Sequence, residues 1–147
     1  MQRIRIKNII KKKGKKPIVC LTAYSITMAE ILDKYCDIIL VGDSLGMVLY
    51  GMKTTREISI ETMILHAKTV KKFANRSLVV FDMPHNTYTN KFIAYKNARK
   101  VIKLTKCDAI KLEGGKGIVK IIRYLTKRGI PVMGHVGLLP QTSTNYK

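Results

Sequence analysis

Three short apolar runs of this sequence each end in a carboxylate. The run IILVGD ends at Asp43, LVVFD at Asp82 and AIKLE at Glu113. The chain has nine acidic residues against a formal net charge of +19, so a third of its acids stand at the ends of its most apolar segments. A carboxylate loses hydration when it is buried, and the loss is tolerated only if a cation or hydrogen-bond donors replace the water. The three acids therefore predict a shared metal-ion or substrate site.

The segments that carry these acids belong to a regular alternation of strands and helices. One predicted helix, which Ser59 caps, places Ile60, Met63, Ile64 and Ala67 at three- and four-residue steps along one face. The other helices are expected near residues 25–35, 91–103 and 117–128, and the strands near residues 17–21, 37–41, 78–81, 109–112 and 131–134. This order predicts an α/β fold with a parallel sheet.

Parallel strands joined by right-handed crossovers put all their carboxyl ends on one side of the sheet. Asp43, Asp82, Glu113 and His135 fall at such ends. In a closed barrel and in an open doubly wound sheet alike, ligands bind on that side. The glycines of GDSLG form neither a GxGxxG fingerprint nor a P-loop, so the sequence does not support a nucleotide-binding motif.

The polar residues beside the acids have both a functional and a structural interpretation. Lys111 lies between Ile110 and Leu112 on a predicted strand, so its side chain points away from the helices if Ile110 and Leu112 point toward them. A lysine that points into a barrel requires an anion as its partner. Ser44 either satisfies a turn or contacts a substrate. His135 either lines the site or is a packed side chain.

The composition is that of one folded domain. Of the 147 residues, 46% are hydrophobic and 25% are charged, which suffices for a substantial core. No apolar run approaches the roughly eighteen residues needed to cross a bilayer, and no signal peptide is recognisable, so we expect a cytoplasmic protein without a membrane segment. The three cysteines, Cys20, Cys36 and Cys107, are expected to be reduced, buried thiols.

The 28 lysines and arginines raise the question of nucleic-acid binding. They are spread along the chain, apart from a dense block from Lys11 to Lys16, and no RNA- or DNA-binding motif accompanies them. A dispersed excess favours a solvated surface over a nucleic-acid site. We divide the chain into a basic N-terminal segment, residues 1–15, and one catalytic domain, residues 16–147.

Five strings in the chain resemble the ketopantoate hydroxymethyltransferase family: TAYS, LVGDSLGMVLYG, VVFDMP, IKLEGG and GIPVMGHVGLLPQ. The resemblance covers the chain from about Lys16 to Gln141. It implies a TIM (β/α)₈ barrel that transfers a hydroxymethyl group from 5,10-methylenetetrahydrofolate to 3-methyl-2-oxobutanoate. The product is 2-dehydropantoate, on the route to pantothenate, and the reaction is assisted by Mg²⁺.

The resemblance also implies roles for individual residues. Asp43 and Asp82 would bind Mg²⁺, with Glu113 as a further ligand or a nearby acceptor, while Asp43, Asp82, Ser44 and Lys111 would bind the 2-oxo acid. These roles agree with the chemistry, because Mg²⁺ prefers hard oxygen ligands and keeps several waters. As a Lewis acid it would stabilise the enolate that attacks the one-carbon unit.

The family's general base, a glutamate, would lie beyond Lys147, so the resemblance assigns no catalytic residue within the chain. We expect this sequence to be the N-terminal portion of the enzyme, with about the first five strands and four helices, and to be unable to turn over substrate alone. Five strands cannot close an eight-stranded barrel, so outer strands would be left unpaired. The family further implies a homo-oligomer, a decamer.

Two other functions remain open. One is a magnesium-dependent lyase or mutase of the phosphoenolpyruvate mutase and isocitrate lyase group, which uses the same barrel but carries a lyase cysteine motif that we do not find here. Dependence on methylenetetrahydrofolate separates the two. The other is a basic anion- or nucleic-acid-binding module. Binding of nucleic acid that persists after substitution of Asp43 and Asp82 would indicate this function.

Overall fold

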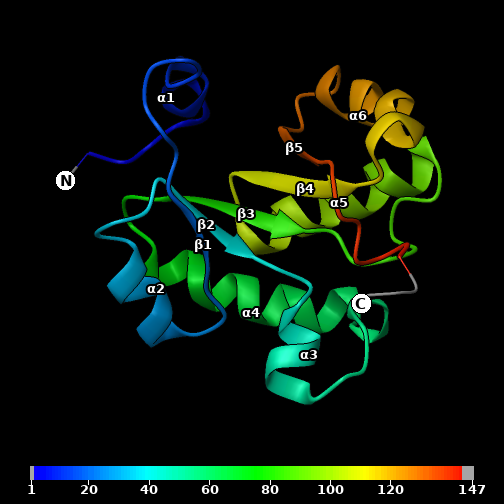
Figure 1. Cartoon of the computed structure of the whole chain (residues 1–147), viewed down its shortest axis with the longest axis horizontal. Coiled ribbons are helices and arrows are strands. Elements are labelled where there is room, and N and C mark those ends of the chain that lie inside the picture. Colours follow the sequence, from blue (N-terminus) through cyan, green and yellow to red (C-terminus); the bar gives the residue numbers. More distant parts are fainter. Residues whose placement is uncertain (1, 144–147) are drawn as a thin grey trace.

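The computed structural model describes residues 2–143, and its strands and helices alternate along the chain (Figure 1). The strands are β1 (Cys20–Thr22), β2 (Ile38–Val41), β3 (Leu78–Asp82), β4 (Ala109–Glu113) and β5 (Val132–His135). The helices are α1 (Ile6–Lys11), α2 (Ile26–Leu32), α3 (Leu45–Tyr50), α4 (Ile60–Phe73), α5 (Lys91–Thr105) and α6 (Val119–Thr126), with 3₁₀ turns η1 (Thr55–Glu57) and η2 (Gly115–Ile118).

The five strands form one parallel sheet in the order β1-β2-β3-β4-β5. This order confirms the predicted α/β alternation, and the sheet is the part of a TIM-type barrel that five consecutive strands would supply. Within residues 2–143, β1 and β5 are the outer strands, and all three residues of β1 are exposed. Adjacent strands bring Asp82 into register with Lys111, and Glu113 into register with His135.

One face of the sheet packs against the long helices. Helix α4 begins as predicted, because the Ser59 side chain accepts a hydrogen bond from the Thr62 N–H, and its Met63, Ala67 and Val70 are buried. From the sheet, the core contains Ile39, Val41, Val79, Phe81, Ile110 and Leu112. Each such large side chain contributes roughly 1.5–3 kcal/mol when it is removed from water, so this face holds most of the fold together.

At its amino end, the opposite face of the sheet is covered by α1. There Ile38, Leu78 and Val80 pack together with Ile6 and Ile9 of α1, part of the basic segment at residues 1–15. Lys111 and Asp82 lie on this same face, further along the strands, because residues two apart on a strand share a face. This face of the sheet therefore carries apolar side chains at its amino end and ionisable side chains at its carboxyl end.

Two short helices and one cysteine differ from what the sequence predicts. Helices α1 and α3 each have six residues and were not predicted, because α1 lies among lysines and α3 is apolar on every side, so neither shows a helical period. Cys36 and Cys107 are buried as expected, whereas the prediction for Cys20 is wrong: it is exposed because β1 is an outer strand.

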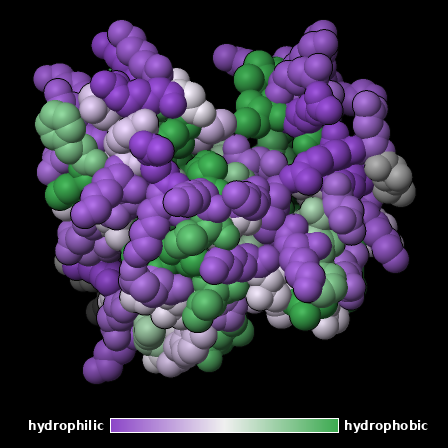
Figure 2. All heavy atoms as spheres, turned by 180° about the vertical axis from the view of Figure 1, so that it is seen from behind, coloured by the Kyte–Doolittle hydropathy of each residue, from purple (hydrophilic) through white to green (hydrophobic). Residues whose placement is uncertain are grey.

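The surface agrees with a dispersed charge. Figure 2 shows hydrophilic side chains spread over one face of the molecule around small hydrophobic areas. Across the described residues, no helix combines the length and the apolar character that crossing a membrane requires.

Candidate active site

The four predicted strand-end residues converge at the carboxyl ends of the sheet. Asp43 follows β2 after Gly42, while Asp82, Glu113 and His135 are the last residues of β3, β4 and β5. The three acids are each no more than 6% exposed. Burial of three carboxylates in a chain of such positive charge requires local compensation, which each of them obtains differently.

Lys111 compensates Asp82 directly. Its Nζ lies 2.6 Å from Asp82 Oδ2, across the β3–β4 register. Ile110 and Leu112 are fully buried against the helices, which confirms the expectation that Lys111 points the other way. The pair is nearly out of water, since the Asp82 side chain is 2% and the Lys111 side chain 14% exposed.

The contact with Lys111 does not fully compensate the buried Asp82 carboxylate. Its pKa is raised to about 7, mainly by burial and in part by the nearby charge of Asp43, while the Lys111 ammonium acts in the opposite direction. Its Oδ1 is buried without a hydrogen-bond partner in the described part of the chain. An unpaired buried carboxylate oxygen beside a second carboxylate is a site that a cation would stabilise.

Glu113 is held by two neighbours. Its Oε1 accepts a hydrogen bond of 2.7 Å from the Gln141 backbone N–H, and its Oε2 lies 3.3 Å from His135 Nδ1, without the alignment of a good hydrogen bond. Burial raises the pKa of Glu113, whereas the Gln141 N–H and His135 act to lower it. A cavity of about 260 Å³ opens beside it, partly lined by Tyr88 and Gln141.

Ser44 stands at the start of α3, next to Asp43. Its hydroxyl lies 2.8 Å from the Tyr24 hydroxyl, and it makes no capping hydrogen bond to its own helix. Its oxygen is therefore committed to Tyr24 and not to the turn. Tyr24 is in turn fixed through its carbonyl oxygen, which lies 2.7 Å from His66 Nδ1.

The described residues contain no group of three or more His, Cys, Asp and Glu side chains arranged to hold a metal ion. Mg²⁺ does not require one, because it commonly uses one or two carboxylates and completes its shell with water and substrate oxygens. Asp43 and Asp82, with the unpaired Asp82 Oδ1, fit that pattern.

Two residues of the site were missed by sequence reasoning. Gln141 is buried and its amide Nε2 donates to Asp43 Oδ2 at 2.8 Å, and the Tyr88 hydroxyl donates to the Gln141 Oε1. Both lie in loops, where no periodicity marks an inward side chain. One signal was available for Gln141: the PQ at the end of GLLPQ is part of a string that resembles the family, but the sequence alone assigned no role to this glutamine.

The sequence matches the family model of ketopantoate hydroxymethyltransferase over residues 3–147. The 3-methyl-2-oxobutanoate hydroxymethyltransferase of Pelagibacter ubique (strain HTCC1062) is 55% identical over 143 residues, which are 97% of this chain and 56% of that protein. The enzyme of that name from Rhizobium etli is 55% identical over 130 residues, 88% of this chain and 48% of that protein. The chain thus spans about half the length of the curated relatives it matches.

Solved structures resemble the fold at low sequence identity. A crystal structure of 2,3-dimethylmalate lyase, a PEP mutase/isocitrate lyase superfamily member, gives a TM-score of 0.64 at 12% identity, covering 91% of this chain and 51% of that one. Oxaloacetate acetylhydrolase gives 0.64 at 9% identity, covering 90% and 53%. These likenesses support the partial barrel, and the match over almost the whole sequence shows that the chain belongs to the ketopantoate hydroxymethyltransferase family.

Proposed function

We propose that this chain supplies the metal- and 2-oxo-acid-binding residues for transfer of a hydroxymethyl group to 3-methyl-2-oxobutanoate. The observation that carries the proposal is the Lys111–Asp82 pair beside Asp43, with Asp82 Oδ1 buried and unpaired among the described residues. A cation and a carboxylate with a free oxygen, at the carboxyl ends of a parallel sheet, suit a metal ion chelated by an anionic substrate.

Asp43 and Asp82 are the residues that would hold Mg²⁺, with Glu113 as a further ligand or acceptor. When bound, Mg²⁺ supplies Lewis-acid stabilisation of negative charge on the oxygen of the 2-oxo acid. Asp82 must be ionised for this role, and the Lys111 ammonium favours its ionised form. Burial of both side chains strengthens these electrostatic interactions by excluding water.

Lys111 and Ser44 are the residues that would bind the substrate carboxylate. The ammonium has three donors, so contact with Asp82 leaves donors for a second anion. The Ser44 hydroxyl shares a hydrogen bond with Tyr24, and that bond holds its oxygen in place. His135, beside Glu113, would line the site.

The wider proposal follows the family. The one-carbon donor would be 5,10-methylenetetrahydrofolate. The catalytic domain would be residues 16–147, preceded by the basic segment of residues 1–15. The protein would be cytoplasmic and would form a homo-oligomer such as a decamer.

Calorimetric titration of the 147-residue chain with 3-methyl-2-oxobutanoate, with and without Mg²⁺, tests the proposal. We expect saturable binding that requires Mg²⁺ and that falls at least tenfold in Asp82→Asn. Binding that is unchanged by chelation of the metal would overturn it. Comparison with 2,3-dimethylmalate as the titrant addresses the lyase alternative, since a lyase site would prefer the larger diacid.

A further inference from the structure

Gln141 links three strand ends through a single side chain and backbone. Its amide Nε2 donates to Asp43 Oδ2 at 2.8 Å and to the carbonyl oxygen of Met83 at 3.0 Å, and its backbone N–H donates to Glu113 Oε1 at 2.7 Å. It is 2% exposed. Asp43 follows β2, Met83 follows β3 and Glu113 ends β4, so one residue holds three of the elements that form the site.

The partners of Gln141 determine which way its amide faces. Asp43 Oδ2 and the Met83 carbonyl can only accept, so both require the NH₂ group, while the Tyr88 hydroxyl donates to Oε1. Burial raises the pKa of Tyr88, which keeps this hydroxyl protonated and able to donate at neutral pH. Both N–H bonds of the amide are therefore used, and one is committed to the Asp43 carboxylate.

We propose that Gln141 is a positioning residue that fixes the Asp43 carboxylate for metal binding. The inference rests on the proposed function and deepens it, because it assigns a role to a residue that does not itself touch the metal. The amide occupies Oδ2 of Asp43 and so orients its other oxygen. Residues that hold metal-binding carboxylates by hydrogen bonds typically contribute about 10- to 100-fold to metal affinity.

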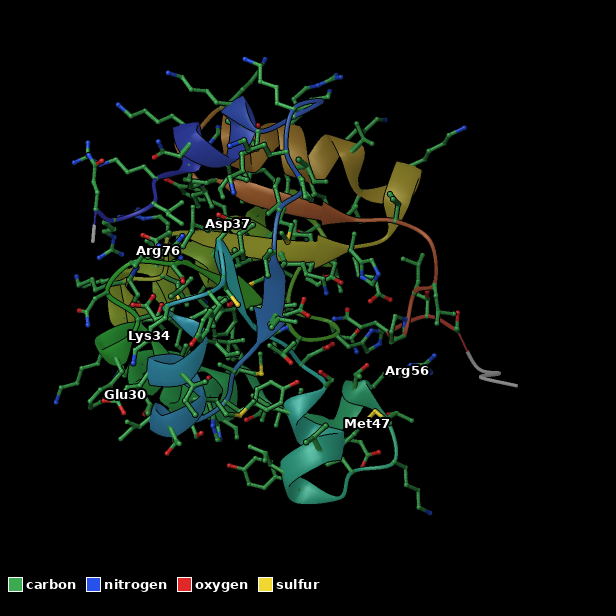
Figure 3. All side chains as sticks on the ribbon, turned by 60° about the vertical axis from the view of Figure 1, so that its left-hand side comes forward. Glu30, Lys34, Asp37, Met47, Arg56 and Arg76 are labelled. Carbon is green, nitrogen blue, oxygen red and sulfur yellow. The ribbon has the colours of Figure 1, made fainter. Side chains whose placement is uncertain are left out.

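The backbone of this loop is anchored separately from the amide. Arg56 Nε donates to the Gln141 carbonyl oxygen at 2.8 Å, and Figure 3 shows Arg56 near α3 and the segment that follows β5. Arg56 also donates to the Ser143 carbonyl at 3.3 Å. A substitution of the Gln141 side chain therefore leaves the loop attached, which allows positioning to be separated from folding.

The test measures Mn²⁺ binding to the full chain by electron paramagnetic resonance, with urea unfolding of each variant. Gln141→Met keeps the length of the side chain but removes both donors, and Gln141→Glu turns an anionic oxygen toward Asp43. We expect both variants to bind Mn²⁺ about 10- to 100-fold more weakly than the wild type. Asn97→Ala is the matched control, because Asn97 Nδ2 holds the nearby Thr87 carbonyl without contacting an acid, and it should leave Mn²⁺ affinity unchanged.

Wild-type affinity in Gln141→Met would overturn the inference while leaving the proposed function intact. If the wild type binds no Mn²⁺, the proposed function fails, and a metal-free measurement decides the role of Gln141.

Three-bond NMR couplings of Asp43 should report one side-chain rotamer in the wild type and an average of rotamers in Gln141→Met. The same single rotamer in both proteins would overturn the positioning role. In the wild type, slow exchange of both Gln141 side-chain amide protons is expected, and rapid exchange would count against it.

Discussion

Lys111 Nζ lies 2.6 Å from Asp82 Oδ2, and the two residues face each other in register on neighbouring strands. The contact joins the inward cation of β4 to a carboxylate whose pKa is raised to about 7. Because Asp82 uses Oδ2 for this contact, its unpaired Oδ1 is the oxygen left for another cation. The pair therefore connects the proposed metal and substrate functions.

Lys111→Met should weaken binding of 3-methyl-2-oxobutanoate by about 10- to 100-fold, since a hydrogen bond to a charged group contributes roughly 1.5–3 kcal/mol. Calorimetry in the presence of Mg²⁺ measures this change. The matched control is Lys100→Met, whose pair with Glu61 is exposed on both sides and should contribute nothing measurable to binding. Equal affinities of the two variants would contradict the role of Lys111.

Metal affinity should rise with pH around neutrality. The pKa of Asp82 is raised to about 7, so at pH 6 the metal must displace a proton that is mostly absent at pH 8, and Mn²⁺ affinity should be about tenfold lower at pH 6. Titrations across this range in buffers of different ionisation enthalpy measure both affinity and proton release. A pH-independent affinity would show that Asp82 is already ionised.

The same raised pKa predicts the direction of metal-free stability. Between about pH 4 and pH 7 the folded protein holds a proton on Asp82 that the unfolded chain has released, so the free energy of unfolding should fall as pH rises through this range. Asp82→Asn should lose this contribution. Urea unfolding of both proteins at pH 5 and pH 8 measures the difference.

Asp33 should show the opposite dependence. Burial acts to raise its pKa, but backbone N–H groups of Ser77, Arg76 and Asn75 donate to its carboxylate and hold the pKa below its usual value. Asp33→Asn should therefore destabilise the fold by roughly 1.5–3 kcal/mol at pH 7, and by progressively less as the pH falls below about 4 and the wild-type carboxyl becomes protonated. Glu30 is exposed on α2, the helix that ends just before Asp33, and Glu30→Gln is the matched control. A loss that stays constant from pH 7 to pH 2.5 would contradict this explanation.

Ser44→Ala separates the substrate from the metal. Removal of the hydroxyl should lower affinity for 3-methyl-2-oxobutanoate several-fold while Mn²⁺ affinity in its absence stays unchanged, because Ser44 contacts Tyr24 and not an acid. Ser59→Ala, which removes the N-cap of α4, should reduce stability by about 1 kcal/mol without changing either affinity. Loss of metal affinity in Ser44→Ala would place Ser44 among the residues that shape the metal site.

The sequence predicted the sheet well because strand ends carry strong signals. Asp82 and Glu113 end apolar runs, and parallel topology requires such ends to meet, so their convergence followed from pattern alone. Gln141 could not be found in this way, because its contact with Asp43 joins residues 98 positions apart and depends on the path of a loop. Cys20 was wrongly placed because its burial depends on which strands neighbour β1, which local sequence does not specify.

The proposed role of Asp43 and Asp82 is tested most directly by measuring Mg²⁺-dependent binding of 3-methyl-2-oxobutanoate to the wild-type chain and to the Asp43→Asn/Asp82→Asn double variant. We expect saturable binding in the wild type that disappears on chelation of Mg²⁺ and is at least 100-fold weaker in the double variant, with both proteins folded by circular dichroism. Equal binding by the two folded proteins, or binding that does not depend on Mg²⁺, would contradict it.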